Sequence, residues 1–259
     1  MVILPLYQVV FAVQEQKFSK TRFFALMHDG QIREMGMPDL RYPSYCASNG
    51  KICGVFYDDQ KGFIALSDLK ITESPLPELV FTLSKHQIAY PVVSPDRQKI
   101  AFIEYGEDET SPVLRLILRE EFGWFPVQLK INAAFSPVCW GGKDALIYTG
   151  RNNELMMISA SPSKRGTAKI DTNAKLPAYH QQSGRLAFVK DDNIILKGKD
   201  NLSFEADSPD MLNFSNDGES LYFTAFKNGN YSLCRFSIEK REATRLCESD
   251  ARIVWAAEI

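Results

Sequence analysis

Acidic residues gather in short polar loops between the apolar segments of this sequence. The most prominent are Asp58, Asp59, Glu107, Asp108, Glu109, Asp191 and Asp192. Loop carboxylates can coordinate calcium when several oxygens meet at one point, act as general acids and bases, or attract a basic partner. Which chemistry applies depends on how the rest of the chain positions them.

Other residue types with potential chemistry form no recognisable motif. The sequence contains no GxSxG, Walker loop, GxGxxG or HExxH pattern. The three histidines, His28, His86 and His180, fall in different repeat units, so we expect no shared metal site. We expect His180 to line a channel or to be hydrogen-bonded. The five cysteines are odd in number and lack a CxxC pair, which predicts reduced thiols, although a disulfide between Cys46 and Cys53 remains an alternative.

Overall charge and the opening segment predict the compartment and exclude some partners. The formal net charge of −2 is not that of a strongly basic nucleic-acid binder. The opening MVILPLYQVVFAV lacks a basic region and a cleavage site, and it is too short to span a bilayer. We interpret Leu6 to Val13 as a core strand and expect a cytoplasmic protein that binds neither nucleic acid nor membranes.

The segments that carry these loops repeat along the chain. Each copy has an anchor residue, a core residue two places later, a tight polar turn and an apolar strand. The anchors are Pro43, Pro91, Pro137, Pro177 and Leu212, and the strands read KICGVFY, KIAFIEY, ALIYTG, RLAFVK and SLYFTA. Two more strands complete each copy. Four strands in a repeat of about 40 residues are typical of β-propeller blades.

We therefore predict an all-β fold, a six-bladed β-propeller that occupies residues 1–259 as a single domain. The chain begins with three strands that lack an anchor and ends with a broken copy of the pattern, Ile253-Val254-Trp255. Pairing this C-terminal strand, as the innermost one, with the N-terminal strands closes the ring without an open sheet edge. The predicted blades are residues 43–87, 88–130, 131–174, 175–209, 210–247, and 248–259 together with 1–42.

Two segments carry a family resemblance. PVVSPDRQKIAFIEY and LNFSNDGESLYFTAF resemble the PxWSPDGxxIAF repeat of TolB-like propellers, a WD40-like repeat that also occurs in the propeller domains of prolyl oligopeptidases. The resemblance runs from Pro43 to the end of the chain and is degenerate, with Arg97 in place of glycine and Asn216 in place of proline. It implies the propeller fold, and without a nucleophile motif it implies no peptidase activity.

The propeller brings the acidic loops together on one face. Loops between the second and third strands of a blade lie on the same face as the connections between blades, and on that face acidic residues outnumber basic ones. We predict a non-catalytic protein-binding module without cofactor or metal, monomeric on its own, whose acidic face docks a basic protein partner through the seven residues named first. An immunity or inhibitor-type protein against a toxin would suit this design.

The alternative is a small-molecule-binding or hydrolytic propeller with a carboxylate-lined, calcium-type site in its central channel, as in lactonase-like propellers. The candidates at the channel mouth are His86, Asp207, Asp210, Glu248 and Asp250.

Overall fold

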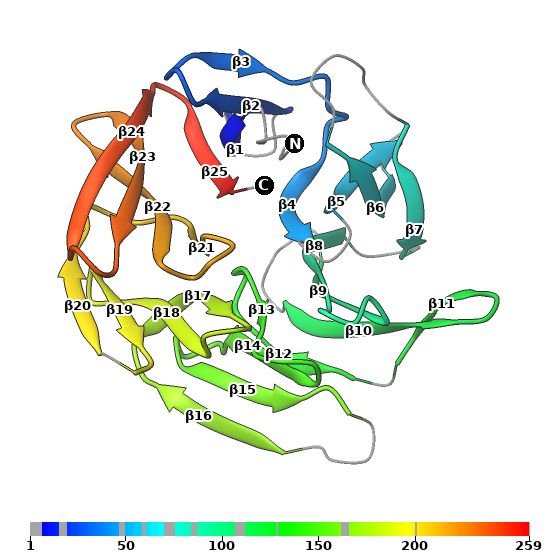
Figure 1. Cartoon of the computed structure of the whole chain (residues 1–259). Helices are drawn as coiled ribbons and strands as arrows, with labels where there is room; N and C mark the ends of the chain where they lie inside the picture. The colour runs from blue at the N-terminus through cyan, green and yellow to red at the C-terminus, as the bar shows by residue number, and fades with distance from the viewer. Residues whose placement is uncertain are drawn as a thin grey trace.

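The computed structural model describes residues 7–15, 20–46, 50–58, 61–69, 76–83, 87–106, 112–127, 129–161, 166–199 and 201–258. Within these residues the protein is all-β, and its strands form six antiparallel sheets arranged as a ring (Figure 1). This confirms the predicted six-bladed propeller. In the described part of the chain, no helix has the length and apolar character that crossing a membrane requires.

Five blades follow one another along the chain, each running from the channel outward. Blade 1 consists of β4 (Arg41–Cys46), β5 (Lys51–Asp58), β6 (Lys61–Asp68) and β7 (Glu78–Thr82). Blade 2 consists of β8 (Gln87–Val93), β9 (Lys99–Tyr105) and β10 (Val113–Glu120), with β11 (Gly123–Pro126) and β12 (Ile131–Asn132) both paired to β10. Blade 3 consists of β13 (Cys139–Trp140), β14 (Ala145–Thr149), β15 (Leu155–Ser159) and β16 (Thr167–Asp171). Blade 4 consists of β17 (Ala174–His180), β18 (Arg185–Lys190), β19 (Asn193–Lys197) and β20 (Leu202–Glu205), and blade 5 of β21 (Leu212–Phe214), β22 (Ser220–Lys227), β23 (Asn230–Ser237) and β24 (Glu242–Ser249).

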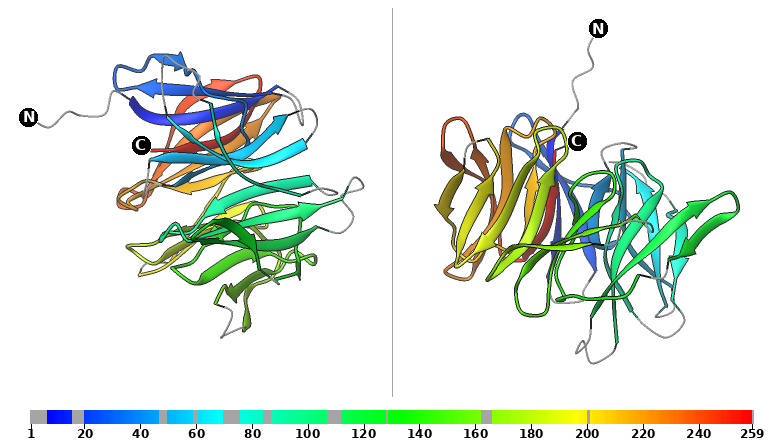
Figure 2. Two further views of the ribbon diagram at one scale, coloured as in Figure 1. Left: turned by 90° about the vertical axis from the view of Figure 1, so that its right-hand side faces the viewer. Right: turned by 90° about the horizontal axis from the view of Figure 1, so that it is seen from below.

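Blade 6 is built from both ends of the chain and closes the ring. Its order is β25 (Arg252–Ala257), β1 (Tyr7–Gln14), β2 (Thr21–Met27) and β3 (Ile32–Glu34). In the ladder Phe11 pairs with Ala256 and Gln14 with Arg252. The predicted closure is thus confirmed, while Leu6, the expected first residue of the strand, lies outside the described residues. Side views show the blades standing next to one another, with their strands crossing the thickness of the ring (Figure 2).

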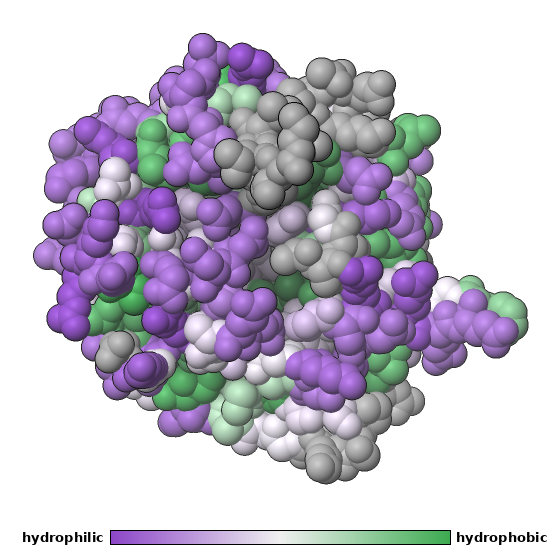
Figure 3. All heavy atoms as spheres, viewed as in Figure 1, coloured by the Kyte–Doolittle hydropathy of each residue, from purple (hydrophilic) through white to green (hydrophobic). Residues whose placement is uncertain are grey.

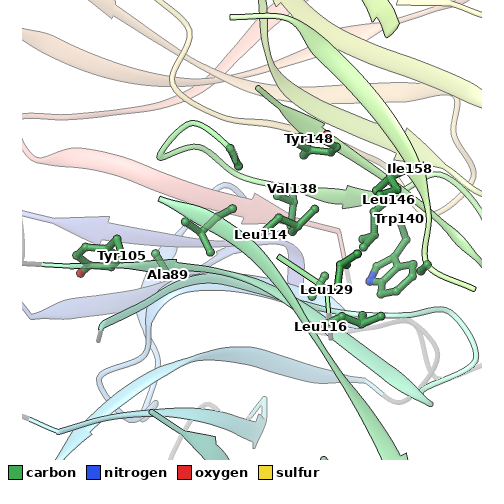
Figure 4. Close-up of a cluster of buried hydrophobic side chains, with 14 residues drawn as sticks. Ala89, Tyr105, Leu114, Leu116, Leu129, Val138, Trp140, Leu146, Tyr148 and Ile158 are labelled. Carbon is green, nitrogen blue, oxygen red and sulfur yellow. The ribbon is translucent and has the colours of Figure 1, made fainter. Parts of the chain in front are cut away.

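The hydrophobic core lies between neighbouring blades. Between blades 2 and 3, Leu114 and Leu116 pack towards Leu146 and Trp140 (Figure 4), and the Trp140 Nε1–H donates to the Val92 carbonyl at 3.0 Å. Because a blade is covered on both sides, its second strand is buried on both faces. In β9 six consecutive residues are buried, so this strand reads as an apolar run and not as the alternation typical of a half-exposed strand.

The outer hairpin of blade 2 extends beyond the ring. Arg119 and Glu120 at the end of β10 lie opposite Trp124 and Gly123 of β11, whereas the pairing of β10 with β9 ends at Leu118. The hairpin stands clear of the remaining surface (Figure 3). Its turn residue Phe122 is 88% exposed and therefore contributes little to the core.

None of the five cysteines, all of which lie within the described residues, forms a disulfide bond. Cys46 lies opposite Lys51 in the ladder, and Cys53 lies opposite Ser44, so the two thiols that could have formed a disulfide are diagonal neighbours. Burial raises the pKa of the Cys53 thiol, which favours the unreactive protonated form.

Candidate binding site at the channel mouth

A cavity of about 820 Å³ occupies the centre of the ring and is lined by residues from all six blades. The innermost strands all begin on the face that carries the connections between blades, which we call the linker face. The linker-side mouth is the end of the cavity on that face. The cavity-lining residues near this end include Gln14, Tyr42, Tyr90, Phe135, Asn153, Lys175, Leu176, Asp210 and Arg252.

One half of this mouth is an aromatic wall supplied by blades 1 to 3. The Tyr42 ring lies 4.7 Å from the Tyr90 ring and 5.9 Å from the Phe135 ring, measured between centroids. Tyr90 and Phe135 are 5.3 Å apart, and Tyr105 supports Phe135 from 4.8 Å. Burial raises the pKa of the Tyr42 phenol. The wall therefore presents neutral aromatic surface to the cavity.

Three residues at this mouth have left-handed backbone conformations. The φ angles are 51° at Tyr42, 50° at Tyr90 and 55° at Leu176. Each residue precedes an anchor proline and lies at a register shift of an innermost strand. Bulky residues, and residues before proline, avoid this region, and such strain costs about 1–3 kcal/mol per residue. These three residues were not among the sequence predictions, although a bulky side chain directly before an anchor proline was a usable signal.

The other half of the mouth carries charged and amide groups from blades 3 to 6. Arg252, the first residue of β25, donates its Nε–H to the Asp210 carboxylate at 2.9 Å. Lys175 lies near the start of β17 and is exposed. Gln14 and Asn153 add amide groups to the lining. Two cations therefore share this half with one carboxylate.

The structure describes only three of the seven acidic residues that were predicted to bind a partner. Asp59, Glu107, Asp108 and Glu109 lie outside the described residues. Asp58 ends β5, and Asp191 and Asp192 form the turn between β18 and β19, so these three are exposed on the linker face. Whether they contact a partner stays a prediction.

The predicted channel-mouth residues do not converge. Asp210 lines the cavity, whereas Asp207, Glu248 and Asp250 are not among the lining residues. Asp207 pairs with Lys227 at 3.1 Å, and Glu248 pairs with Arg245. His86 lies outside the described residues. In the part of the chain that the structure describes, no three His, Cys, Asp or Glu side chains are grouped to hold a metal ion.

Ion pairing on the linker face predicts a dependence of stability on pH at Asp171. Hydrogen bonds from Lys190 Nζ at 2.6 Å and Lys197 Nζ at 2.9 Å hold the pKa of this carboxyl well below its usual range. Its contribution is therefore present above about pH 4, near the pKa of an unfolded aspartate, and is lost as the pH falls through the lowered folded value. We expect Asp171→Asn to reduce the free energy of unfolding at pH 7 by about 1 kcal/mol, since the lysines are partly exposed.

Urea unfolding of wild type and Asp171→Asn at pH 7 and pH 3 measures this effect. The difference between the two proteins is expected to shrink at pH 3. Asp191→Asn, an exposed carboxylate of the same face, serves as the control with little change at either pH. A difference for Asp171→Asn that is the same at both pH values contradicts the ion-pair account.

Comparisons with known proteins show the fold. No protein-family model and no curated protein matches the sequence. TolB from Acinetobacter baumannii is similar in structure, with a TM-score of 0.72 and 12% identity over 97% of this chain and 66% of that chain. A chain in a crystal structure of a nidogen/laminin complex matches with a TM-score of 0.68 and 10% identity, covering 96% of this chain and 97% of that one. A proposed 6-phosphogluconolactonase from Bacteroides uniformis matches with a TM-score of 0.61 and 10% identity over 93% and 82%. These likenesses support a TolB-like propeller fold, and a fold alone does not assign a function.

Proposed function

We propose that this chain is a non-catalytic protein-binding propeller that seats a short segment of its partner in the linker-side mouth. The observation that carries the proposal is the aromatic wall of Tyr42, Tyr90 and Phe135, facing a cavity of about 820 Å³. Rigid aromatic side chains at the centre of a contact supply much of the binding energy in protein complexes. Two of the three rings sit on strained backbone, as is common at ligand-binding positions.

The exposed acids of the linker face have a separate role in this proposal. Asp58 lies on blade 1, and Asp191 and Asp192 lie in the β18–β19 turn of blade 4, close in the ladder to Lys175. All three are exposed and available to attract a basic partner. An immunity or inhibitor-type role against a toxin stays a prediction. It requires that the partner be a toxin and that the chain protect cells that express it.

The enzyme alternative has less support from the geometry. A calcium-type or hydrolytic centre needs several carboxylates or histidines at one point. Among the described candidates only Asp210 faces the cavity, and it is already paired with Arg252. Lactone hydrolysis that is lost in Asp210→Asn, or a melting temperature that rises with calcium, would restore this alternative.

A synthetic pool of random hexapeptides tests the proposed function. Peptides retained by the immobilised wild type are identified by mass spectrometry, and their Kd values are measured by calorimetry. We expect Tyr90→Ala to raise the Kd values of the retained peptides about 30-fold, because the loss of a central aromatic contact costs about 2 kcal/mol. If the acidic loops take part in binding, the protein prefers basic peptides, and added salt raises the Kd values of those peptides.

The matched control is Phe226→Ala. Phe226 is 39% exposed at the end of β22 on the same face, but it does not line the cavity. Its replacement is expected to leave the Kd values unchanged. A pool from which nothing is retained, or peptides that bind Tyr90→Ala as well as wild type, would overturn the proposed function.

A further inference from the structure

The charges at the linker-side mouth are the reverse of those that the sequence predicts. The acids expected there are either outside the lining or neutralised by a neighbouring base. Of the charged residues that line this mouth, Lys175 and Arg252 are cationic and Asp210 is anionic. The mouth therefore carries a net positive charge within a linker face that was expected to be acidic.

Donors at this mouth remain available for a ligand. Asp210 accepts from Arg252 Nε, and among the described residues neither Nη group of Arg252 has a hydrogen-bond partner. Its side chain remains 43% exposed. Lys175 is exposed, and within the described residues its ammonium group forms no ion pair. Free donors on a guanidinium and an ammonium group bind carboxylates well.

The arrangement of the two halves narrows the chemistry of the ligand. Lys175 comes from blade 4 and Arg252 from blade 6, whereas the aromatic wall comes from blades 1 to 3 on the other side of the same cavity. A ligand that satisfies both halves has an anionic group next to an apolar side chain. The last residue of a peptide has both features, because its carboxylate and its side chain are attached to one carbon atom.

We propose that the linker-side mouth binds the C-terminal carboxylate of the partner segment at Lys175 and Arg252, with the last side chain of that segment against Tyr42, Tyr90 and Phe135. This proposal rests on the proposed function and specifies its ligand. A basic partner with a free, apolar C-terminus fits both the exposed acids of the linker face and the cationic half of the mouth.

The test compares two hexapeptide pools of the same sequences, one with free C-termini and one amidated. We expect the wild type to retain the free pool at least ten times more strongly than the amidated pool. Lys175→Gln and Arg252→Gln are each expected to raise the Kd values of the retained peptides about tenfold. Arg151→Gln removes an exposed cation of the same face that does not line the cavity, and it should change nothing. The double variant Arg252→Gln/Asp210→Asn removes the pair together, so that no carboxylate is left unpaired, and it is expected to bind as weakly as Arg252→Gln.

The outcomes separate this proposal from the proposed function. Equal retention of the two pools with a loss of binding in Tyr90→Ala overturns the carboxylate site and leaves the peptide-binding function standing. If the protein retains amidated peptides that contain an internal Asp or Glu, the carboxylate that it binds belongs to a side chain. That outcome also overturns the proposal. N-acetylphenylalanine serves as a small-acid probe. If it binds as tightly as the best hexapeptide, a free acid is the ligand and the C-terminal assignment is wrong.

Discussion

Replacing Trp255 with alanine will lower the free energy of unfolding by about 3–5 kcal/mol, the usual cost of removing a buried tryptophan. Trp255 is 5% exposed and lies opposite Ala12 in the ladder that joins the two ends of the chain. Its ring meets Phe23 edge-on, with 6.3 Å between centroids. Removing it weakens the seam between β25 and the N-terminal strands, where no covalent connection holds the blade together.

Chemical denaturation followed by circular dichroism measures this loss. Phe122→Ala, at the exposed end of the blade 2 hairpin, is the control, and its stability is expected to remain within about 0.5 kcal/mol of wild type. Deleting residues 252–259 is the stronger form of the experiment, and it is expected to abolish the cooperative transition. An unchanged midpoint for Trp255→Ala would mean that the ring does not depend on this closure.

The sequence was sufficient for the architecture because the propeller repeats one local pattern. The anchor, the polar turn and the apolar strand are properties of neighbouring residues, and their recurrence from Pro43 to Leu212 indicated the blades directly. The seam was also predictable, since the last copy, Ile253-Val254-Trp255, lacks the strands that the N-terminus supplies. Both inferences use only sequence order and the need to pair every sheet edge.

The candidate site was harder to predict because it depends on contacts between blades. The pairing of Arg252 with Asp210 joins residues far apart in the chain, and no local pattern indicates that it neutralises an acid at the mouth. The aromatic wall likewise combines Tyr42, Tyr90 and Phe135 from three blades. Counting charges by loop could not show which of the acids reach the channel.

Gly218 shows how such a contact restricts the repeat. It occupies the glycine position of the SNDG turn with φ at 72°. The equivalent turn of blade 2 has Arg97 with φ at 60°, so the left-handed backbone alone does not require glycine. In blade 5 a Cβ atom would lie 2.2 Å from Nδ1 of His180. That ring is 9% exposed, and it joins blades 4 and 5 because its Nε2 lies 3.1 Å from the Asn216 carbonyl oxygen.

We therefore expect Gly218→Ala to destabilise the protein by about 3–5 kcal/mol, combining about 1 kcal/mol for the backbone with the displacement of a packed ring and its hydrogen bonds. Gly229→Ala is the matched control, since its φ is 87° and no atom lies within 4 Å of the added Cβ, and it should cost only about 1 kcal/mol.

A double-mutant cycle of Gly218→Ala and His180→Ala, measured by chemical denaturation, isolates the contact between residue 218 and the His180 ring. In a His180→Ala background, Gly218→Ala is expected to cost no more than Gly229→Ala does, because the ring that it would displace is gone. An equal cost in both backgrounds would show that the turn itself, and not the histidine of the neighbouring blade, requires the glycine.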